Sequence, residues 1–191
     1  EQQVAMLSEE EQAVILEGID FEELAWDWRW SARPEQYLDP HDESWSVTLA
    51  MAGRGAGKTK MSTEWIKAMD AEWANMPERH GITGDGTLRI ALLSRTAADV
   101  RDTLITGPSG LLHIYPPSLA DKVEWVPSLR KLTLPYGGTA ITFSAEEPER
   151  LRGPQFEAAW ADEFCIWPYP DETLANLRLG LRLGRLPQLV V

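Results

Sequence analysis

The sequence predicts an α/β domain with a mostly parallel central sheet flanked by helices. Apolar runs typical of buried strands alternate with segments of helical character over residues 47–191. A glycine-rich loop lies between the first of these strands and the first helix. The composition, 43% hydrophobic and 25% charged over 191 residues, is that of one folded domain with a sizeable core.

The N-terminal quarter differs from the rest of the chain in charge. Residues 1–50 contain 13 acidic and 2 basic side chains, whereas the whole chain carries a net charge of −12. Ser8 and Glu11 have the spacing of a capping box and precede an amphipathic pattern that runs to residue 28. We therefore expect an acidic helical extension over residues 1–30 and the α/β domain over residues 31–191. The remainder is close to neutral, so charge neither supports nor excludes a nucleic-acid partner.

The order of the elements follows from periodicity and from turn residues. Leu129–Leu134 and Thr139–Phe143 flank a Pro-Tyr-Gly-Gly turn and predict a hairpin. The other expected strands are 47–52, 88–93, 156–161 and 186–191, and the expected helices are 58–74, 96–105 and 171–183.

Several classes of protein are excluded by what the sequence lacks. Cys165 is the only cysteine, which excludes an intrachain disulfide framework. No apolar run approaches the roughly 18 residues of a membrane span, and the acidic N-terminus does not resemble a signal peptide, so we expect no membrane partner and a reducing cytoplasm. The three histidines have no ligand spacing, and no metal site is expected beyond that of a bound nucleotide.

The loop Gly53-Arg54-Gly55-Ala56-Gly57-Lys58-Thr59 follows an expected strand and opens an expected helix. This is the context of a P-loop, or Walker A, motif, whose backbone N–H groups surround phosphates at the positive end of the helix. Lys58 would contact the β- and γ-phosphates and Thr59 would ligate Mg²⁺. Ala52 replaces the first glycine of the general pattern. The sequence thus predicts a site for a nucleoside triphosphate, ATP, with Mg²⁺.

Asp162 and Glu163 end an apolar run about a hundred residues later and form a candidate Walker B pair. A parallel strand would deliver both carboxylates to the edge of the sheet beside the phosphate-binding loop. Asp162 would hold Mg²⁺ through water, and Glu163 would orient the attacking water. Acidic strand ends are also common on solvated surfaces, but the pair together with the loop favours a hydrolase over a kinase.

Other polar residues allow two interpretations each. Arg150 and Arg152, just before the acidic strand, could stabilise the charge of a γ-phosphate or lie in a surface turn. Gln36 could pair with the edge of adenine or be an ordinary loop residue. A basic series at helical spacing could face DNA or solvent: Arg178, Arg182 and Arg185.

Four segments, in this order, resemble the large terminase subunit of tailed bacteriophages and gene transfer agents: 32–36, 52–59, 144–154 and 160–163. The resemblance spans residues 32–167. It implies an additional-strand, RecA-like ATPase fold and a DNA-packaging motor that couples Mg-ATP hydrolysis to translocation of double-stranded DNA into a procapsid.

The resemblance also implies roles for individual residues. Arg54 corresponds to the loop arginine that contacts the phosphates, and Gln36 to the glutamine associated with adenine. Glu163 corresponds to the catalytic carboxylate. Arg152 corresponds to an arginine finger that acts on the ATP of a neighbouring subunit. The family's coupling motif and nuclease domain would follow Val191, so this chain is not expected to cut DNA.

The implied partners are double-stranded DNA, a small terminase subunit and the portal protein. The family implies a homo-oligomeric ring, typically a pentamer, docked on the procapsid portal in the host bacterial cytoplasm, with a monomer in isolation. Two alternatives remain at this point. One is another P-loop ATPase of nucleic acid, such as a helicase-like remodeller. The other is a nucleotide-binding assembly module without turnover, with the acidic N-terminal helix as its docking surface.

Overall fold

The computed structural model describes residues 24–76 and 86–191. The N-terminal helix expected within residues 8–28 lies mostly outside these residues. The helices are α3 (Trp28–Ser31), α4 (Lys58–Glu72), α5 (Ala97–Asp99), which continues as the π-helix η5 (Val100–Ile105), α6 (Pro117–Ala120) and α7 (Pro170–Gly180). The strands are β1 (Val47–Thr48), β2 (Arg89–Ser94), β3 (Glu124–Val126), β4 (Lys131–Thr133), β5 (Thr139–Ser144), β6 (Ala158–Ala161) and β7 (Gln188–Val190).

One seven-stranded sheet organises the described residues, in the order β1-β7-β6-β2-β5-β4-β3. The first five strands of this order are parallel, and β4 and β3 add an antiparallel edge. The predicted mostly parallel sheet and the predicted β4–β5 hairpin are therefore confirmed. The strand β7 lies between β1, which leads to the glycine-rich loop, and β6, which leads to Asp162. This intervening strand is the arrangement expected of the additional-strand fold.

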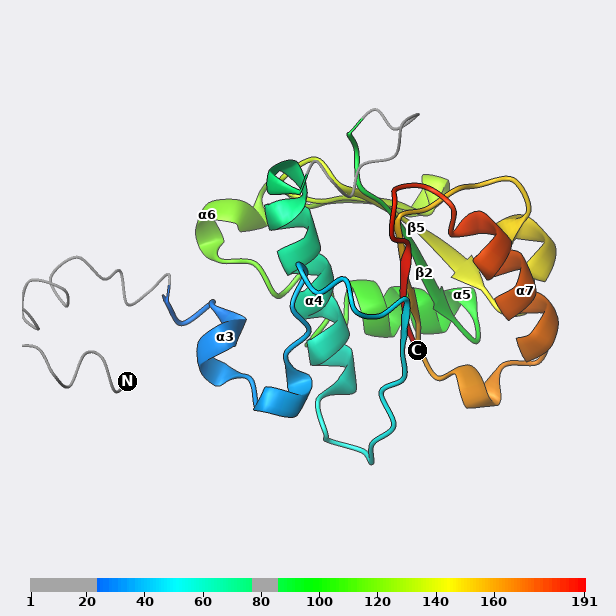
Figure 1. Ribbon diagram of the computed structural model, residues 1–191, viewed down its shortest axis with the longest axis horizontal. Coiled ribbons are helices and arrows are strands. Elements are labelled where there is room, and N and C mark those ends of the chain that lie inside the picture. Colours follow the sequence, from blue (N-terminus) through cyan, green and yellow to red (C-terminus); the bar gives the residue numbers. More distant parts are fainter. Residues whose placement is uncertain (1–23, 77–85) are drawn as a thin grey trace, which may run out of the picture.

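Helices cover both faces of the sheet, with α4 on one side and α7 on the other (Figure 1). Successive side chains of β2 point to opposite faces of the sheet. Ile90 and Leu92 pack in the hydrophobic cluster under α4, and Ala91 and Leu93 pack in the cluster under α7. Such two-sided burial makes the strand continuously apolar. On α4, a helically spaced set of side chains faces the sheet: Met61, Trp65, Ile66 and Met69.

Short 3₁₀ turns link the main elements: η2 (Pro34–Gln36), η3 (Trp73–Asn75), η6 (Pro127–Leu129), η7 (Pro148–Leu151) and η8 (Phe164–Ile166). The strand β3 and these turns were not expected from the sequence. The strand expected over residues 47–52 is shorter in the structure. Only Val47 and Thr48 form β1, and the chain from Leu49 to Gly55 continues as an irregular segment to the start of α4.

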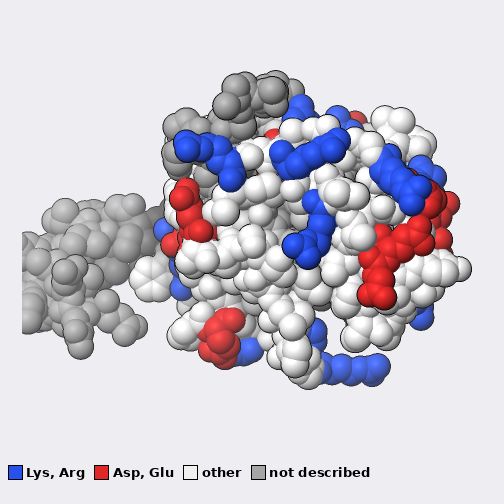
Figure 2. Space-filling model, turned by 45° about the vertical axis from the view of Figure 1, so that its right-hand side comes forward, with Lys and Arg blue, Asp and Glu red and all other residues white. Residues whose placement is uncertain are grey.

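The helix α7 ends earlier than expected. It stops at Gly180, where a side chain would lie against the Phe156 ring and the carbonyl of Pro154, and the chain then makes a β-bridge at Leu181. The predicted helical face of three arginines is therefore wrong, because only Arg178 belongs to the helix. On the face drawn in Figure 2, the basic side chains of the described residues lie in several separate groups, some of them beside acidic ones.

Candidate nucleotide site

The glycine-rich loop, residues 53–59, connects the chain after β1 to the first turn of α4. Gly55 and Gly57 have φ values of 76° and 82°, in the left-handed region that only glycine adopts without strain. Gly57 is the N-cap of the 15-residue helix α4. The loop therefore ends at the positive end of a helix dipole with free backbone N–H groups, which favours an anionic ligand.

Lys58 lies across this loop. Its Nζ donates to the carbonyl oxygens of Ala52 at 2.6 Å and Gly53 at 3.2 Å. These are neutral acceptors at an exposed site, so an anionic phosphate would compete with them successfully for the ammonium. Arg54 is also exposed in the loop.

The acidic pair lies at the carboxyl end of β6. The pKa of Asp162 is raised to about 6, mainly by burial and also by the charge of Glu163, while the charge of Lys58 opposes the shift. No described residue donates a hydrogen bond to the Asp162 carboxylate. Such a carboxylate gains from a nearby cation.

Glu163 is exposed and has a φ of 51°. A non-glycine residue in this region costs about 1–3 kcal/mol and is held there by its surroundings. The turn is fixed by two bonds at Asp162. Its N–H donates to the carbonyl oxygen of Leu93 at 2.8 Å, and its carbonyl oxygen accepts from Nε1 of Trp167 at 2.9 Å.

A cavity of about 630 Å³ brings three of the predicted residues together, whereas Arg54 and Thr59 line neither this cavity nor the one next to it. Its lining includes Lys58, Asp162 and Glu163, together with apolar residues from the segment after β1 and from η8. A second cavity, of about 380 Å³, lies on the Gln36 side of the loop and shares Lys58 with the first. Gln36 and the acidic pair thus line two separate cavities that share Lys58 and residues 49–52.

The donor set fits a Mg²⁺ ion that arrives with a nucleotide. Among the described residues, no group of three His, Cys, Asp or Glu side chains could hold a metal ion on its own. Mg²⁺ keeps several waters and is commonly bound by one or two carboxylates together with substrate phosphates. Asp162, with its unbonded carboxylate beside the loop, and Thr59, in the first turn of α4, are the residues that would hold it.

Gln36 is buried, and both ends of its amide are engaged. Nε2 donates to the carbonyl oxygen of Ala56 at 2.8 Å, and Oε1 accepts from the N–H of Arg33 at 3.1 Å. Arg33 reaches the same Ala56 carbonyl at 2.9 Å. A contact between Gln36 and adenine stays a prediction.

Arg152 follows η7 and is exposed. Its guanidinium pairs with Glu149 at 2.7 Å and Glu172 at 3.7 Å, and its Nε lies 3.5 Å from Oδ1 of Asn176. Arg152 lines neither of the two cavities beside the loop. Its position is compatible with action on a neighbouring subunit, which stays a prediction.

Two supporting residues were missed from the sequence. Arg33 has no local signal, because its guanidinium contacts the Ala56 carbonyl oxygen 23 residues further along the chain. Trp167 has no local signal, because its bond to the Asp162 carbonyl depends on the three-dimensional turn after β6.

The sheet and this site define a RecA-like P-loop ATPase fold. The strand before the glycine-rich loop, β1, and the strand before the acidic pair, β6, are separated by β7. Residues 49–191 match the family model described as "Terminase large subunit, T4likevirus-type, N-terminal". The match covers about three quarters of the chain, and the protein belongs to this family.

Solved structures agree with the fold. The chain is similar to the large terminase of a thermophilic bacteriophage in complex with ATP-γ-S, with a TM-score of 0.53 and 16% identity over 89% of this chain and 36% of that chain. For the same terminase in complex with ADP, the TM-score is 0.51 and the identity 15%, over 90% of this chain and 38% of that one. The chain thus spans a little over a third of these solved terminases. Among curated proteins there is no significant match.

Proposed function

We propose that this chain is an ATP-hydrolysing domain of a terminase large subunit. The observation that carries the proposal is the cavity that joins Lys58 of the phosphate-binding loop to Asp162 and Glu163 at the end of β6. A site built only to bind a nucleotide needs the loop and its lysine. The exposed carboxylate of Glu163, held in a strained turn beside the loop, supplies what hydrolysis needs in addition.

Each residue has a distinct role in this mechanism. The loop N–H groups and Lys58 bind the β- and γ-phosphates, and Lys58 exchanges its bonds to Ala52 and Gly53 for phosphate oxygens. Thr59 and Asp162 would hold Mg²⁺, Asp162 through water, and the ion would neutralise charge that develops on the phosphates. Glu163 accepts a hydrogen bond from the attacking water and aligns it with the γ-phosphorus. The water oxygen bonds to this phosphorus as the bond to the β,γ-bridging oxygen breaks, the proton released by the water passes through Glu163 to solvent, and ADP and inorganic phosphate leave.

The assembly is part of the proposal. We infer a ring of subunits, of the pentameric kind that the family resemblance implies, on the portal of a procapsid in the host cytoplasm. Double-stranded DNA is the translocated substrate and a small terminase subunit is a partner. Arg152 stabilises the γ-phosphate charge in the site of a neighbouring subunit, so an isolated subunit turns over slowly. Among the described residues, no helix is long and apolar enough to cross a membrane.

Mg²⁺-dependent ATP hydrolysis over a range of protein concentrations tests this function. We expect the activity per subunit to rise with concentration. A mixture of Lys58→Ala and Arg152→Ala subunits, each inactive alone, should regain activity, because one variant supplies an intact site and the other an intact arginine. A mixture that stays as inactive as the two separate variants, or an Arg152→Ala variant that alone hydrolyses ATP at the wild-type rate, would contradict a role in trans.

The two alternatives predict other results. A nucleotide-binding assembly module would bind Mg-ATP at every concentration without hydrolysing it. A helicase-like remodeller would separate the strands of a DNA duplex, whereas a packaging ATPase moves along the duplex and leaves it paired. The family match over residues 49–191 favours the terminase interpretation over the helicase.

A further inference from the structure

The segment from Trp26 to Gln36, here called the N-terminal strap, runs from the outer side of α4 to the phosphate-binding loop. At its far end, Gln36 is only 8% exposed and its Nε2 donates to the Ala56 carbonyl oxygen. A side chain on Gly57 would lie 2.5 Å from the same nitrogen, so the amide is packed directly against the loop. The strap is therefore in contact with the backbone that must surround the phosphates.

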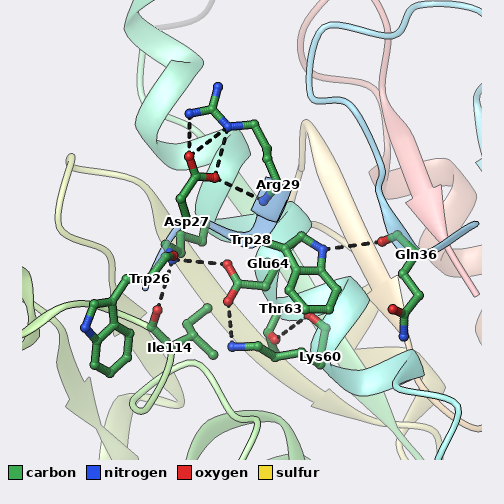
Figure 3. Close-up of polar contacts among 10 residues, drawn as sticks. Trp26, Asp27, Trp28, Arg29, Gln36, Lys60, Thr63, Glu64 and Ile114 are labelled. Atoms are coloured by element: carbon green, nitrogen blue, oxygen red, sulfur yellow. Dashed lines mark hydrogen bonds and ion pairs between the residues drawn. The ribbon is translucent and has the colours of Figure 1, made fainter. Parts of the chain in front are cut away.

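The near end of the strap is fastened by Lys67, a half-buried cation on α4. Lys67 Nζ donates to the Trp26 carbonyl oxygen at 2.7 Å and to the Ile114 carbonyl oxygen at 3.1 Å. It also pairs with Glu64 at 3.1 Å. The ammonium has three donors, and these three acceptors come from three separate segments of the chain. Figure 3 shows Glu64 beside the strap, paired with Lys60.

The middle of the strap is held by the other partner of Glu64. Lys60 pairs with Glu64 at 2.6 Å and lies 5.8 Å from the centre of the Trp28 ring. Nε1 of Trp28 in turn donates to the backbone carbonyl of Gln36 at 3.4 Å (Figure 3). Because Glu64 is only 4% exposed, this pairing is not an ordinary surface ion pair. A continuous set of contacts thus links Lys67 to Ala56 in the loop.

We propose that Lys67 is a positioning residue for nucleotide binding, which acts through the strap and Gln36 on the phosphate-binding loop. This inference rests on the proposed function only in that the loop binds a nucleotide. Lys67 lines a different cavity, on the outer side of α4, and neither of the two beside the loop. It fixes the strap, the strap holds the Ala56 carbonyl, and the loop is kept ready for phosphate. Preorganisation of this kind lowers the entropy lost on binding.

Lys67→Met tests the proposal, because it keeps the apolar stem and removes the ammonium. In the ligand-free protein, we expect faster hydrogen exchange of the loop amides at residues 53–59. The dissociation constant of a fluorescent ATP analogue should rise by the order of tenfold, within the usual range of coupling between sites. Lys131→Met, at an exposed lysine on β4, is the matched control and should change neither quantity.

A double-mutant cycle separates positioning from general destabilisation. Gln36→Ala cuts the link between strap and loop, so Lys67→Met should have little further effect on affinity in that background. Full additivity of the two changes, or unchanged exchange of the loop amides in Lys67→Met, would overturn the proposal. If Lys67→Met does not fold, Trp28→Phe replaces it, since it keeps an aromatic ring beside Lys60 and removes the donor to Gln36. Hydrogen exchange of the loop amides is measured without nucleotide. A chain that fails to hydrolyse ATP would therefore contradict the proposed function and leave this test of Lys67 valid.

Discussion

The backbone at Glu163 allows a prediction in which stability and activity move in opposite directions. Glu163→Gly and Glu163→Ala both remove the carboxylate, and both are expected to abolish hydrolysis. They differ only in backbone freedom. With φ at 51°, alanine keeps the left-handed strain and glycine releases it. Since that strain costs about 1–2 kcal/mol and glycine is more flexible when unfolded, the glycine variant should be more stable by about 1 kcal/mol.

Urea denaturation of the two variants, followed by tryptophan fluorescence, measures the difference. Ala175→Gly, at an exposed position within α7, is the matched control and should be less stable than wild type by about 1 kcal/mol. Glycine should therefore be more stable than alanine at position 163 and less stable than alanine at position 175. If Glu163→Ala were as stable as Glu163→Gly or more stable, the strained turn would be refuted as a feature of the protein in solution.

Three further predictions concern other parts of the fold. Asp70→Asn should lower the free energy of unfolding by about 1–3 kcal/mol, because an amide oxygen can replace only one of the two bonds that the carboxylate accepts from the β4–β5 turn. Burial raises the Asp70 pKa, so its protonation adds stability that is complete below the ordinary value of 3.8 and is lost as the pH rises through the raised pKa. The stability difference between wild type and Asp70→Asn, measured by denaturation, should therefore widen as the pH falls towards 3.8; a constant difference would contradict the burial effect. Tyr115→Phe should be neutral or stabilising by up to about 1 kcal/mol in thermal unfolding, because the buried hydroxyl has no partner among the described residues; a clear loss of stability would reveal a bond. Gly57→Ala should weaken nucleotide binding, measured by titration, because alanine is strained at a φ of 82°; wild-type affinity would contradict the loop geometry.

The sequence was sufficient for those parts of the fold that depend on local pattern. The continuous apolar runs of β2 and β6 predicted buried parallel strands, because each face of the sheet is covered by a helix. The glycine-rich loop was identified from its place between an expected strand and an expected helix, and the structure gives Gly55 and Gly57 the positive φ values that glycine allows. The family match and the sheet order confirm the fold class.

The features that were missed depend on tertiary contacts. The strand β3 has the short sequence Glu-Trp-Val, which gains its strand conformation only by pairing with β4. The end of α7 is set by the packing of Gly180 against Phe156, which lies far away in sequence. The left-handed turn at Glu163 has no sequence signal, because glutamate is not a residue that favours it.

The strap could not be predicted for a similar reason. Lys60, Glu64 and Lys67 have the spacing of ordinary surface pairs on a helix. Only the structure places Glu64 in the interior and brings the carbonyls of Trp26 and Ile114 to Lys67, 41 and 47 residues away in sequence.

The central claim is that one site both binds ATP and hydrolyses it, with separate residues for the two tasks. The most direct test measures ATP affinity and hydrolysis rate in the same samples of wild type, Lys58→Ala and Glu163→Gln. We predict that Lys58→Ala loses binding, whereas Glu163→Gln binds ATP as wild type does and hydrolyses it about 10²–10⁴-fold more slowly. Hydrolysis by Glu163→Gln at the wild-type rate would contradict the account.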